Sequence, residues 1–184
     1  MLISITLIER TVPGFTGLTD AISKAFSAQI TTSTIDLPIT RSYDAEGKRF
    51  DAELFLKELR PFRPGADIGI FIFREDLYVK GKDFVFGHAA GADCIVSTYR
   101  LDPRLYGETD LPKAGALFRK RLLAQAIYHA AKCIGLEDCP DKACPMAPAL
   151  SLGELDSRGG DFCPRCSREL GLKIQSRKHS PKGP

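Results

Sequence analysis

Long apolar runs are missing from this sequence of 184 residues. No stretch reaches the roughly 18 consecutive apolar residues of a membrane span, so we expect none. Charge of one sign is also scarce, because the formal net charge is +3, which is too small by itself to argue for nucleic acid as a partner. The apolar start, residues 1–8, lacks a basic segment and a small-residue cleavage site. It therefore predicts a buried strand, no export signal and a cytoplasmic protein.

Six cysteines are present, and without an export signal they indicate bound metal and free thiols in preference to disulfides. Four of them form two close pairs, C-x4-C and C-x2-C, at Cys139, Cys144, Cys163 and Cys166. Two such pairs suit one tetrahedral zinc ion with four thiolate ligands, which would hold together a loop-rich segment with little core. Two disulfides, unpartnered thiols and an iron–sulfur cluster are the alternatives. Cys94 and Cys133 are expected in the core.

The length of the chain predicts one domain with a sizeable core. Strand and helix patterns alternate along its first hundred residues. We expect strands at 2–8, 29–35, 67–73, 83–86 and 92–98, and helices at 18–26 and 52–59. The segment 67–73 is apolar almost throughout, which places its strand at the centre of a sheet. The alternation implies a largely parallel sheet with helices packed on it.

Several smaller features are also predicted. Thr16 or Thr19 is available to cap the first helix, and Asp51 the second. The connecting and terminal segments are predicted as follows: a loop, or alternatively an extended connection, at 38–51, a loop at 100–111, a short strand or turn at 150–152, a last helix near 163–170 and a mobile basic tail at 176–184.

The longest helix is expected to begin near Asp110, with Pro112 in its first turn, and to end at Gly135, which suits a left-handed C-cap. One face of this helix should be buried: Leu123, Ala126, Ile127, Ala130 and Ile134. A second face at three- and four-residue spacing should line a cleft: Phe118, Arg121, Gln125, Tyr128 and Lys132.

Residues 128–139 have the frame of a metzincin zinc site, HExxHxxGxxH, followed at once by a cysteine. The four paired cysteines then continue it as C-x4-C-x-M and C-x-x-C, with Met146 as the methionine. This series resembles the archaemetzincins, a metzincin clan of small, intracellular, mostly archaeal zinc metallopeptidases. The segments 76–79, 84–87 and 96–101 look like the strands and the substrate-side edge of that family.

The resemblance implies a catalytic zinc on two histidines of the helix and a third ligand beyond the glycine, with a glutamate as general base. In this sequence Tyr128 stands at the first histidine, His129 at the glutamate, Lys132 at the second histidine and Asp138 at the third ligand. Lysine is a poor ligand, because its ammonium must lose a proton to bind metal. We therefore expect one structural zinc, no catalytic zinc and no peptidase activity. Met146 stands at the family's Met-turn position, which implies the floor of that site.

A cation and an anion at two ligand positions predict an ion pair between Lys132 and Asp138, with the Tyr128 hydroxyl as a further partner. The alternative is that all three side chains are solvated around a shallow cleft. His129 could still carry a proton. A rearranged zinc site with His88 would require the helix face to rotate by one residue, which the intact glycine frame argues against.

The predicted fold class is α/β: a metzincin-like mixed sheet with helices, a long active-site helix and a small zinc-stapled C-terminal subdomain. We expect three parts: an N-terminal subdomain at 1–135, a cysteine-rich subdomain at 136–175 and the tail at 176–184.

The function predicted from these residues is that of an archaemetzincin-like pseudoenzyme that binds a peptide or protein segment in its cleft. The segment would pair with the edge strand at Phe84, Val85, Phe86 and Gly87. An active metallopeptidase with a rearranged metal site and a nucleic-acid-binding zinc module that uses the basic tail are the alternatives.

Overall fold

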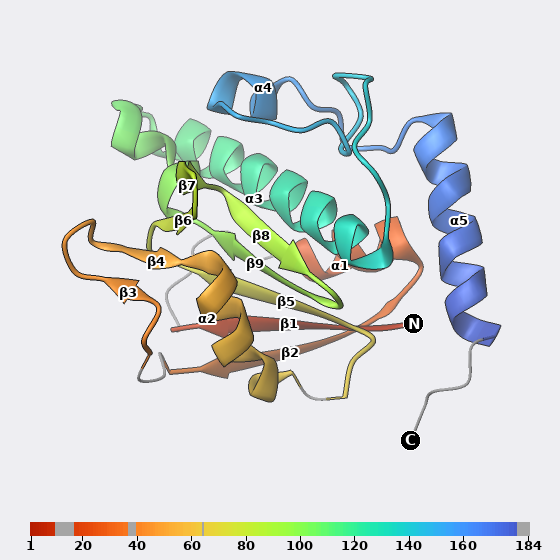
Figure 1. Cartoon of the computed structure of the whole chain (residues 1–184). Helices are drawn as coiled ribbons and strands as arrows, with labels where there is room; N and C mark the ends of the chain where they lie inside the picture. The colour runs from red at the N-terminus through yellow and green to blue at the C-terminus, as the bar shows by residue number, and fades with distance from the viewer. Residues whose placement is uncertain (10–16, 37–39, 64, 180–184) are drawn as a thin grey trace.

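The computed structural model describes residues 1–9, 17–36, 40–63 and 65–179 (Figure 1). Its strands are β1 (Leu2–Ile8), β2 (Gln29–Ile35), β3 (Tyr43–Asp44), β4 (Arg49–Asp51), β5 (Ile68–Phe73), β6 (Leu77–Val79), β7 (Lys82–Val85), β8 (Gly87–Ala90) and β9 (Asp93–Ser97). Its α-helices are α1 (Leu18–Phe26), α2 (Ala52–Leu59), α3 (Leu111–Ile134), α4 (Leu152–Asp156) and α5 (Pro164–His179). Short 3-10 helices are η1 (Arg60–Phe62), η2 (Tyr99–Leu101) and η3 (Pro103–Tyr106).

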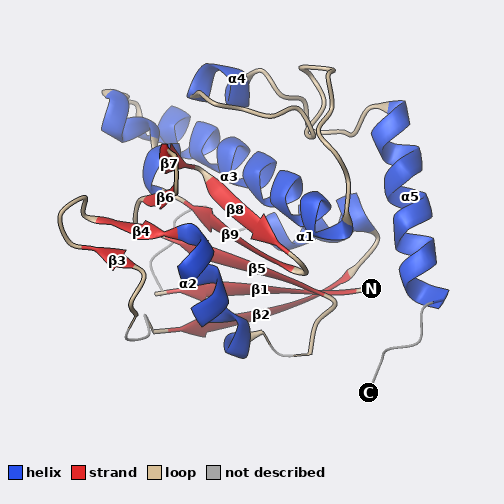
Figure 2. Cartoon of the chain, in the orientation of Figure 1, coloured by secondary structure: helices blue, strands red, loops and turns tan. Residues whose placement is uncertain are grey.

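The main sheet has the strand order β2-β1-β5-β9-β8. Its first four strands are parallel to their neighbours, and β8 lies antiparallel to β9 at one edge. Helix α2 covers one face of this sheet, and α1 and α3 cover the other (Figure 2). The predicted α/β class, the largely parallel sheet and the central position of the strand at 68–73 are confirmed.

Strand β5 illustrates why a continuous apolar run predicts a central strand. Ile68, Ile70 and Ile72 belong to the core beneath α1 and α3, whereas Phe71 and Phe73 belong to the core beneath α2. Successive side chains of a strand point to opposite faces of the sheet. Because both faces are covered by helices here, every position along the strand is buried and apolar.

The ends of the helices follow from local chemistry. The carboxylates of Asp51 and Asp110 accept hydrogen bonds from backbone N–H groups in the first turns of α2 and α3. Gly135 ends α3 with φ at 101°, a left-handed conformation that suits glycine. The predicted range of α1 is correct but its predicted cap was wrong, because Gly17 is the N-cap residue, no side chain caps it, and Thr19 lies inside the helix. Thr16 lies outside the described residues.

A second, smaller sheet has the order β3-β4-β6-β7. Two of its strands lie in the segment predicted as a loop at 38–51, of which residues 37–39 are not described. Packed aromatic rings hold this sheet to the core: the ring centroid of Phe50 lies 4.9 Å from that of Tyr43 in a tilted pair and 4.9 Å from that of Phe73 in an edge-to-face pair. The prediction of a loop was wrong here because two- and three-residue strands are too short for a periodic pattern. The other predicted loop, 100–111, contains η2 and η3.

The strand predicted at 83–86 corresponds to β7, which ends at Val85. β7 belongs to the smaller sheet, and β8 begins at Gly87 in the main sheet. Phe86 lies between them, and its carbonyl accepts a hydrogen bond of 2.9 Å from the backbone N–H of Ser97. β8 is the edge strand of the main sheet, so the backbone groups on its outer side have no strand partner in the described part of the chain.

The C-terminal part differs in two details from the prediction. The Ser151 hydroxyl accepts a hydrogen bond from the backbone N–H of Glu154, so residues 151–156 form a capped helix and not a short strand. Helix α5 runs to His179, beyond the predicted end near residue 170. Residues 176–179 of the predicted tail are therefore helical, and residues 180–184 lie outside the described chain.

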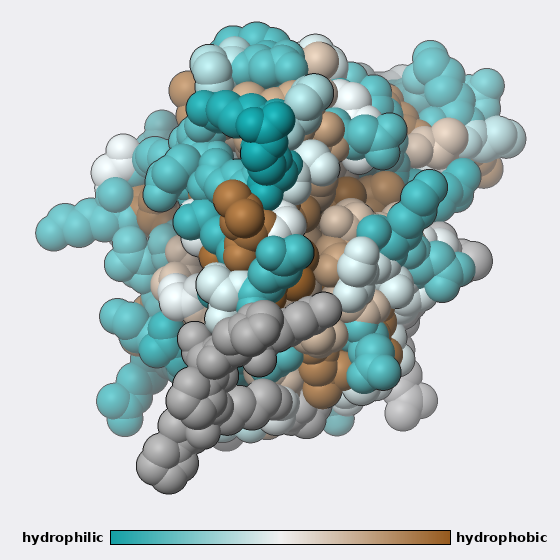
Figure 3. All heavy atoms as spheres, turned by 90° about the vertical axis from the view of Figure 1, so that its right-hand side faces the viewer, coloured by the Kyte–Doolittle hydropathy of each residue, from teal (hydrophilic) through white to brown (hydrophobic). Residues whose placement is uncertain are grey.

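The face of the molecule in Figure 3 is mixed, with hydrophilic residues over much of its upper part and some apolar residues exposed near its centre. None of the helices in the described ranges is both long enough and apolar enough to cross a membrane. The apolar side chains of the chain are used chiefly in the two cores on either side of the main sheet.

Candidate functional site

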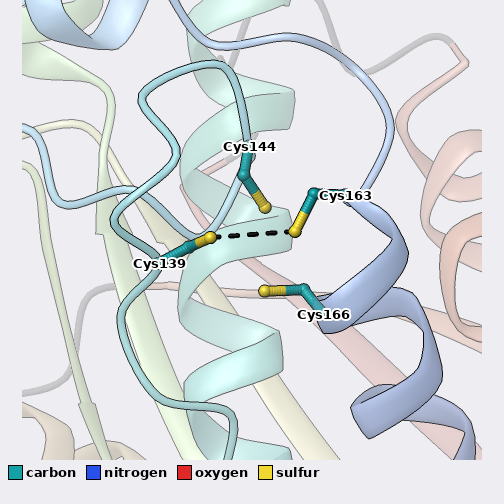
Figure 4. Close-up of side chains that lie close together, drawn as sticks. All are labelled: Cys139, Cys144, Cys163 and Cys166. Atoms are coloured by element: carbon teal, nitrogen blue, oxygen red, sulfur yellow. Dashed lines mark hydrogen bonds between the residues drawn. The ribbon is translucent and has the colours of Figure 1, made fainter.

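Four cysteines converge where α3 and α5 approach one another. Cys139 and Cys144 come from the loop after α3, and Cys163 and Cys166 from the start of α5 (Figure 4). Their sulfur atoms all lie within 4.8 Å of one another, and the Sγ atoms of Cys139 and Cys163 are 3.7 Å apart. Four sulfur atoms bound at about 2.3 Å to a tetrahedral zinc ion lie roughly 3.8 Å from one another. The cluster therefore has the dimensions of a four-thiolate zinc site, and all four side chains are free cysteines and not disulfides.

The thiols of this cluster differ in their readiness to ionise. The backbone N–H of Cys166 points at Cys163 and helps to lower the pKa of its thiol to about 7. Burial raises the pKa of Cys166 to about 12 and that of Cys144 above its usual value. A bound zinc ion would supply the positive charge that holds all four sulfur atoms as thiolates.

A second cluster lies at the end of α3. The Tyr128 hydroxyl donates a hydrogen bond of 2.8 Å to Oδ1 of Asp138, and Nζ of Lys132 lies 3.2 Å from the same oxygen. Lys132 also lies 3.6 Å from a carboxylate oxygen of Glu137. Burial, followed by this contact with Asp138, raises the pKa of the Tyr128 hydroxyl, which stays protonated and donates.

The turn at Gly135 brings these side chains together. The backbone N–H of Gly135 bonds the carbonyl groups of Ala131 and Lys132, and that of Leu136 bonds Ala131 at 3.0 Å. Leu136 is only 1% exposed, so it anchors the reversed chain in the core. Asp138 thus returns beside the last turn of the helix, as the sequence predicts.

These residues do not fit the catalytic zinc that the metzincin frame implies. The Lys132 ammonium donates to Asp138, and an ammonium offers a metal no lone pair. In the described chain, only the four cysteines bring three or more His, Cys, Asp or Glu ligand atoms within reach of one ion. His88, His129 and Asp138 form no such group, so the rearranged zinc site has no support in these residues.

His129 lies under the edge strand and is 7% exposed. A Cβ atom added to Gly87 would lie 2.6 Å from its Nε2 atom and 2.6 Å from the backbone oxygen of Ile95. Only glycine permits so close an approach of ring and strand. Burial, with smaller effects from the neighbouring His88 and Arg158, lowers the pKa of His129 to about 3. Its imidazole is therefore neutral at neutral pH.

A cavity of about 510 Å³ opens beside this cluster. The predicted edge segment, Phe84, Val85, Phe86 and Gly87, forms one wall, and Gln125, Tyr128 and His129 of α3 form another. Lys132 lies outside this cavity and lines a smaller neighbouring one of about 260 Å³. The prediction that the second face of α3 lines a cleft is therefore correct for Gln125 and Tyr128. Arg121 is instead buried against Asp156 of α4, at 2.7 Å.

Met146 is fully buried beside the cysteine cluster, and its carbonyl accepts a hydrogen bond of 2.8 Å from the backbone N–H of Cys139. It belongs to the same core as Ala130 and Ile134 of α3. Cys94 and Cys133 are buried in that core too, as predicted. The expected face of α3 is buried apart from Leu123, which is half-buried.

One residue of the site was not predicted. Arg158, between α4 and α5, is 2% exposed and lines the larger cavity, with its guanidinium carbon 4.8 Å from the centroid of the Tyr128 ring. It lies in a segment with no periodic pattern. No signal in the sequence could have placed it beside Tyr128.

The sequence of the chain is similar to those of known proteins. The family model described as Peptidase family M54 matches residues 53–172. The archaemetzincin of Pyrococcus abyssi is 32% identical over 133 residues, which cover 70% of this chain and 69% of that protein. The archaemetzincin of Methanocaldococcus jannaschii is 31% identical over 138 residues, which cover 74% of this chain and 73% of that protein.

Solved structures agree with this fold. The crystal structure of the archaemetzincin of Methanopyrus kandleri superposes with a TM-score of 0.82 at 25% identity, over 95% of this chain and 96% of that one. The structure described as a zinc-dependent peptidase of Methanocorpusculum labreanum has a TM-score of 0.81 at 23% identity, over 91% of this chain and 99% of that one.

Proposed function

The chain belongs to peptidase family M54, the family of the archaemetzincins, and we propose that it is a member without a catalytic zinc that binds a peptide segment without hydrolysing it. The observation that carries the proposal is the contact of 3.2 Å between Nζ of Lys132 and Oδ1 of Asp138. These residues stand at two of the three ligand positions of the metzincin frame.

The chemistry of the remaining positions supports the same proposal. Hydrolysis by a metzincin requires a carboxylate that removes a proton from water polarised by the metal. His129, at the position of that carboxylate, is buried and has a pKa lowered to about 3, so it is a very weak base. Tyr128 is protonated and donates its hydrogen bond to Asp138.

Binding of a peptide is supported by the edge of the main sheet. The outer side of β8 offers backbone groups to which an extended peptide could add as a further strand. The segment from Phe84 to Gly87, predicted as the binding edge, leads into β8 and lines the cavity of about 510 Å³. A peptide along β8 would place a side chain or its C-terminus in this cavity.

The four cysteines have a structural role in this proposal. A zinc ion held by Cys139, Cys144, Cys163 and Cys166 would join the loop after α3 to the start of α5. Residues 136–175 would then act as a subdomain that depends on the metal for its fold. The wall of the cavity at Pro148, Ala149 and Leu150 belongs to this subdomain.

The test of this proposal restores the metal ligands and the glutamate of the metzincin frame. Tyr128→His, His129→Glu, Lys132→His and Asp138→His together should allow the chain to bind a second zinc ion, measured by elemental analysis. The matched control carries the other three changes and keeps Lys132, whose ammonium should still exclude the second ion. The unmodified chain should cleave no peptide in a fluorogenic library. Cleavage that a chelator abolishes, and that Asp138→Ala also abolishes, would contradict the proposal.

A further inference from the structure

Arg158 is a buried cation without an anionic partner among the described residues. Its side chain makes no hydrogen bond and no ion pair within the described residues, and its Nε and Nη1 atoms are buried and unsatisfied. Its one specific contact is with the face of the Tyr128 ring, 4.8 Å from the guanidinium carbon. A buried guanidinium without an acceptor is costly, because its hydration is lost and nothing replaces it.

The carboxylates whose charges act on Arg158, and Asp156 two residues before it in the chain, are engaged with other groups. Asp138 accepts from Tyr128 and Lys132, and Asp156 is paired with Arg121. Glu154 accepts from the backbone N–H of Leu150 at 2.7 Å. Asp138 and Glu154 favour the charged form of Arg158, but burial is the larger effect and lowers its pKa. Arginine nonetheless stays protonated in proteins, so the positive charge remains uncompensated by any contact.

A second buried polar group lines the same cavity. Gln125 is 2% exposed, and its carboxamide makes no side-chain hydrogen bond in the described part of the chain. It lies three residues before Tyr128 on α3, so it belongs to the same face of the helix as the ring that Arg158 covers. A cation and an amide donor therefore line one cavity, whose other walls include Phe84, Phe86 and Leu150.

We propose that Arg158 and Gln125 form a subsite that binds a carboxylate group of the peptide ligand, with an apolar side chain beside it. This inference rests on the proposed function and adds the class of ligand. A carboxylate would give the guanidinium a planar acceptor that matches its donors. A phosphate fits less well, because its second negative charge would meet Asp138 in the same cavity. The carboxylate belongs either to the C-terminus of the peptide or to an acidic side chain.

Calorimetric titration of the unmodified full chain tests the subsite with three short peptides. The first is N-acetyl-Ala-Ala-Leu with a free C-terminal carboxylate, the second is its C-terminal amide, and the third is N-acetyl-Ala-Glu-Leu amide. A fourth probe, isovalerate, presents a carboxylate and a branched apolar group without a peptide. We expect the free acid to bind at least tenfold more tightly than its amide. If the glutamyl amide binds as tightly as the free acid, the subsite accepts an acidic side chain.

Two variants show whether Arg158 itself, or any positive charge near the cavity, causes the preference for a carboxylate. Arg158→Gln should remove the difference between acid and amide, whereas Lys82→Gln, which neutralises an exposed cation on the same cavity, should keep it. If Arg158→Gln does not fold, the affinities of the unmodified chain for the three peptides still test whether the subsite binds a carboxylate. Equal affinity for the free acid, its amide and the glutamyl amide would overturn the subsite and leave peptide binding standing. Binding of isovalerate alone would support the subsite and overturn peptide binding, and no binding of any probe would overturn both.

Discussion

Lys132 and Asp138 form an ion pair across the end of α3, with 3.2 Å between Nζ and Oδ1. The Lys132 side chain is 27% exposed and that of Asp138 is 50% exposed, so water solvates both in part. The pair therefore fixes the direction of the chain after Gly135 more than it stabilises the fold. An exposed pair of this kind contributes about 0.2–1 kcal/mol.

A double-mutant cycle measures this pair. Lys132→Ala should lower the free energy of unfolding by about 0.2–1 kcal/mol in the chain that has Asp138, and should change it little in the Asp138→Ala background, where the ion pair is already absent. Urea unfolding of the unmodified chain, the two single variants and the double variant gives the coupling free energy between Lys132 and Asp138. The same cycle in 1 M NaCl should show most of it lost, since the screening length there is about 3 Å. Fully additive losses at low salt would contradict the pair.

His129 makes the stability of the fold depend on pH. Its folded pKa is lowered to about 3 from the usual 6.5, so unfolding takes up a proton below pH 6.5. Stability should therefore be complete above pH 6.5 and fall as the pH falls toward 3, by up to about 1.4 kcal/mol per pH unit.

The window from pH 6.5 to 5 isolates this effect from most carboxylates. In that window, His129→Gln should unfold at a urea midpoint that changes much less with pH than the midpoint of the unmodified chain. His88→Gln is the control. Burial also lowers the pKa of His88, but this ring is only half-buried, so its removal should leave most of the pH dependence. Equal pH dependence with and without His129 would refute the assignment.

Gly87 allows the edge strand to approach α3. Gly87→Ala would place a Cβ atom 2.6 Å from both the His129 ring and the backbone oxygen of Ile95. Overpacking of this kind should lower the free energy of unfolding by about 1–3 kcal/mol, measured by urea unfolding. Gly115→Ala is the matched control, because the new Cβ atom would meet only the end of the Arg119 side chain at 3.4 Å. This change in α3 should raise stability by up to about 1 kcal/mol. A neutral Gly87→Ala would show that ring and strand are free to separate.

A zinc ion bound by the four cysteines should hold the C-terminal segment in its folded conformation. Cys163→Ser should remove zinc and increase proteolysis within residues 136–175, because the loop after α3 would lose its connection to α5. Cys94→Ala, which changes a buried thiol outside the cluster, should keep one zinc ion per chain. Limited proteolysis with zinc analysis on both variants checks this. An unchanged cleavage pattern in Cys163→Ser would show that the segment folds without metal.

Local features of this fold could be predicted from the sequence because their causes are local. The cap at Asp110 and the turn at Gly135 depend on one residue each, and together they position Lys132 and Asp138. The four cysteines converge as their paired spacing predicts. The central strand β5 is apolar at nearly every position because both of its faces are buried.

Other features depend on contacts between segments far apart in the chain. Strands β3 and β4 are too short for a pattern, and aromatic packing of Phe50 on Phe73 holds them in place. The sequence does not indicate whether Arg158 is buried, because that depends on the path of its loop. Only the fold places it over the Tyr128 ring. The burial of His129 follows from its contact with Gly87, which no spacing along the helix predicts.

Zinc stoichiometry tests the central claim most directly, that this member of peptidase family M54 keeps a cysteine site and lacks the catalytic one. Elemental analysis of the purified full chain, dialysed against buffer containing micromolar zinc, should give one zinc ion per chain. The same measurement on Cys163→Ser should give none. Two zinc ions per chain in the unmodified protein, or one that survives in Cys163→Ser and disappears in Asp138→Ala, would contradict the account.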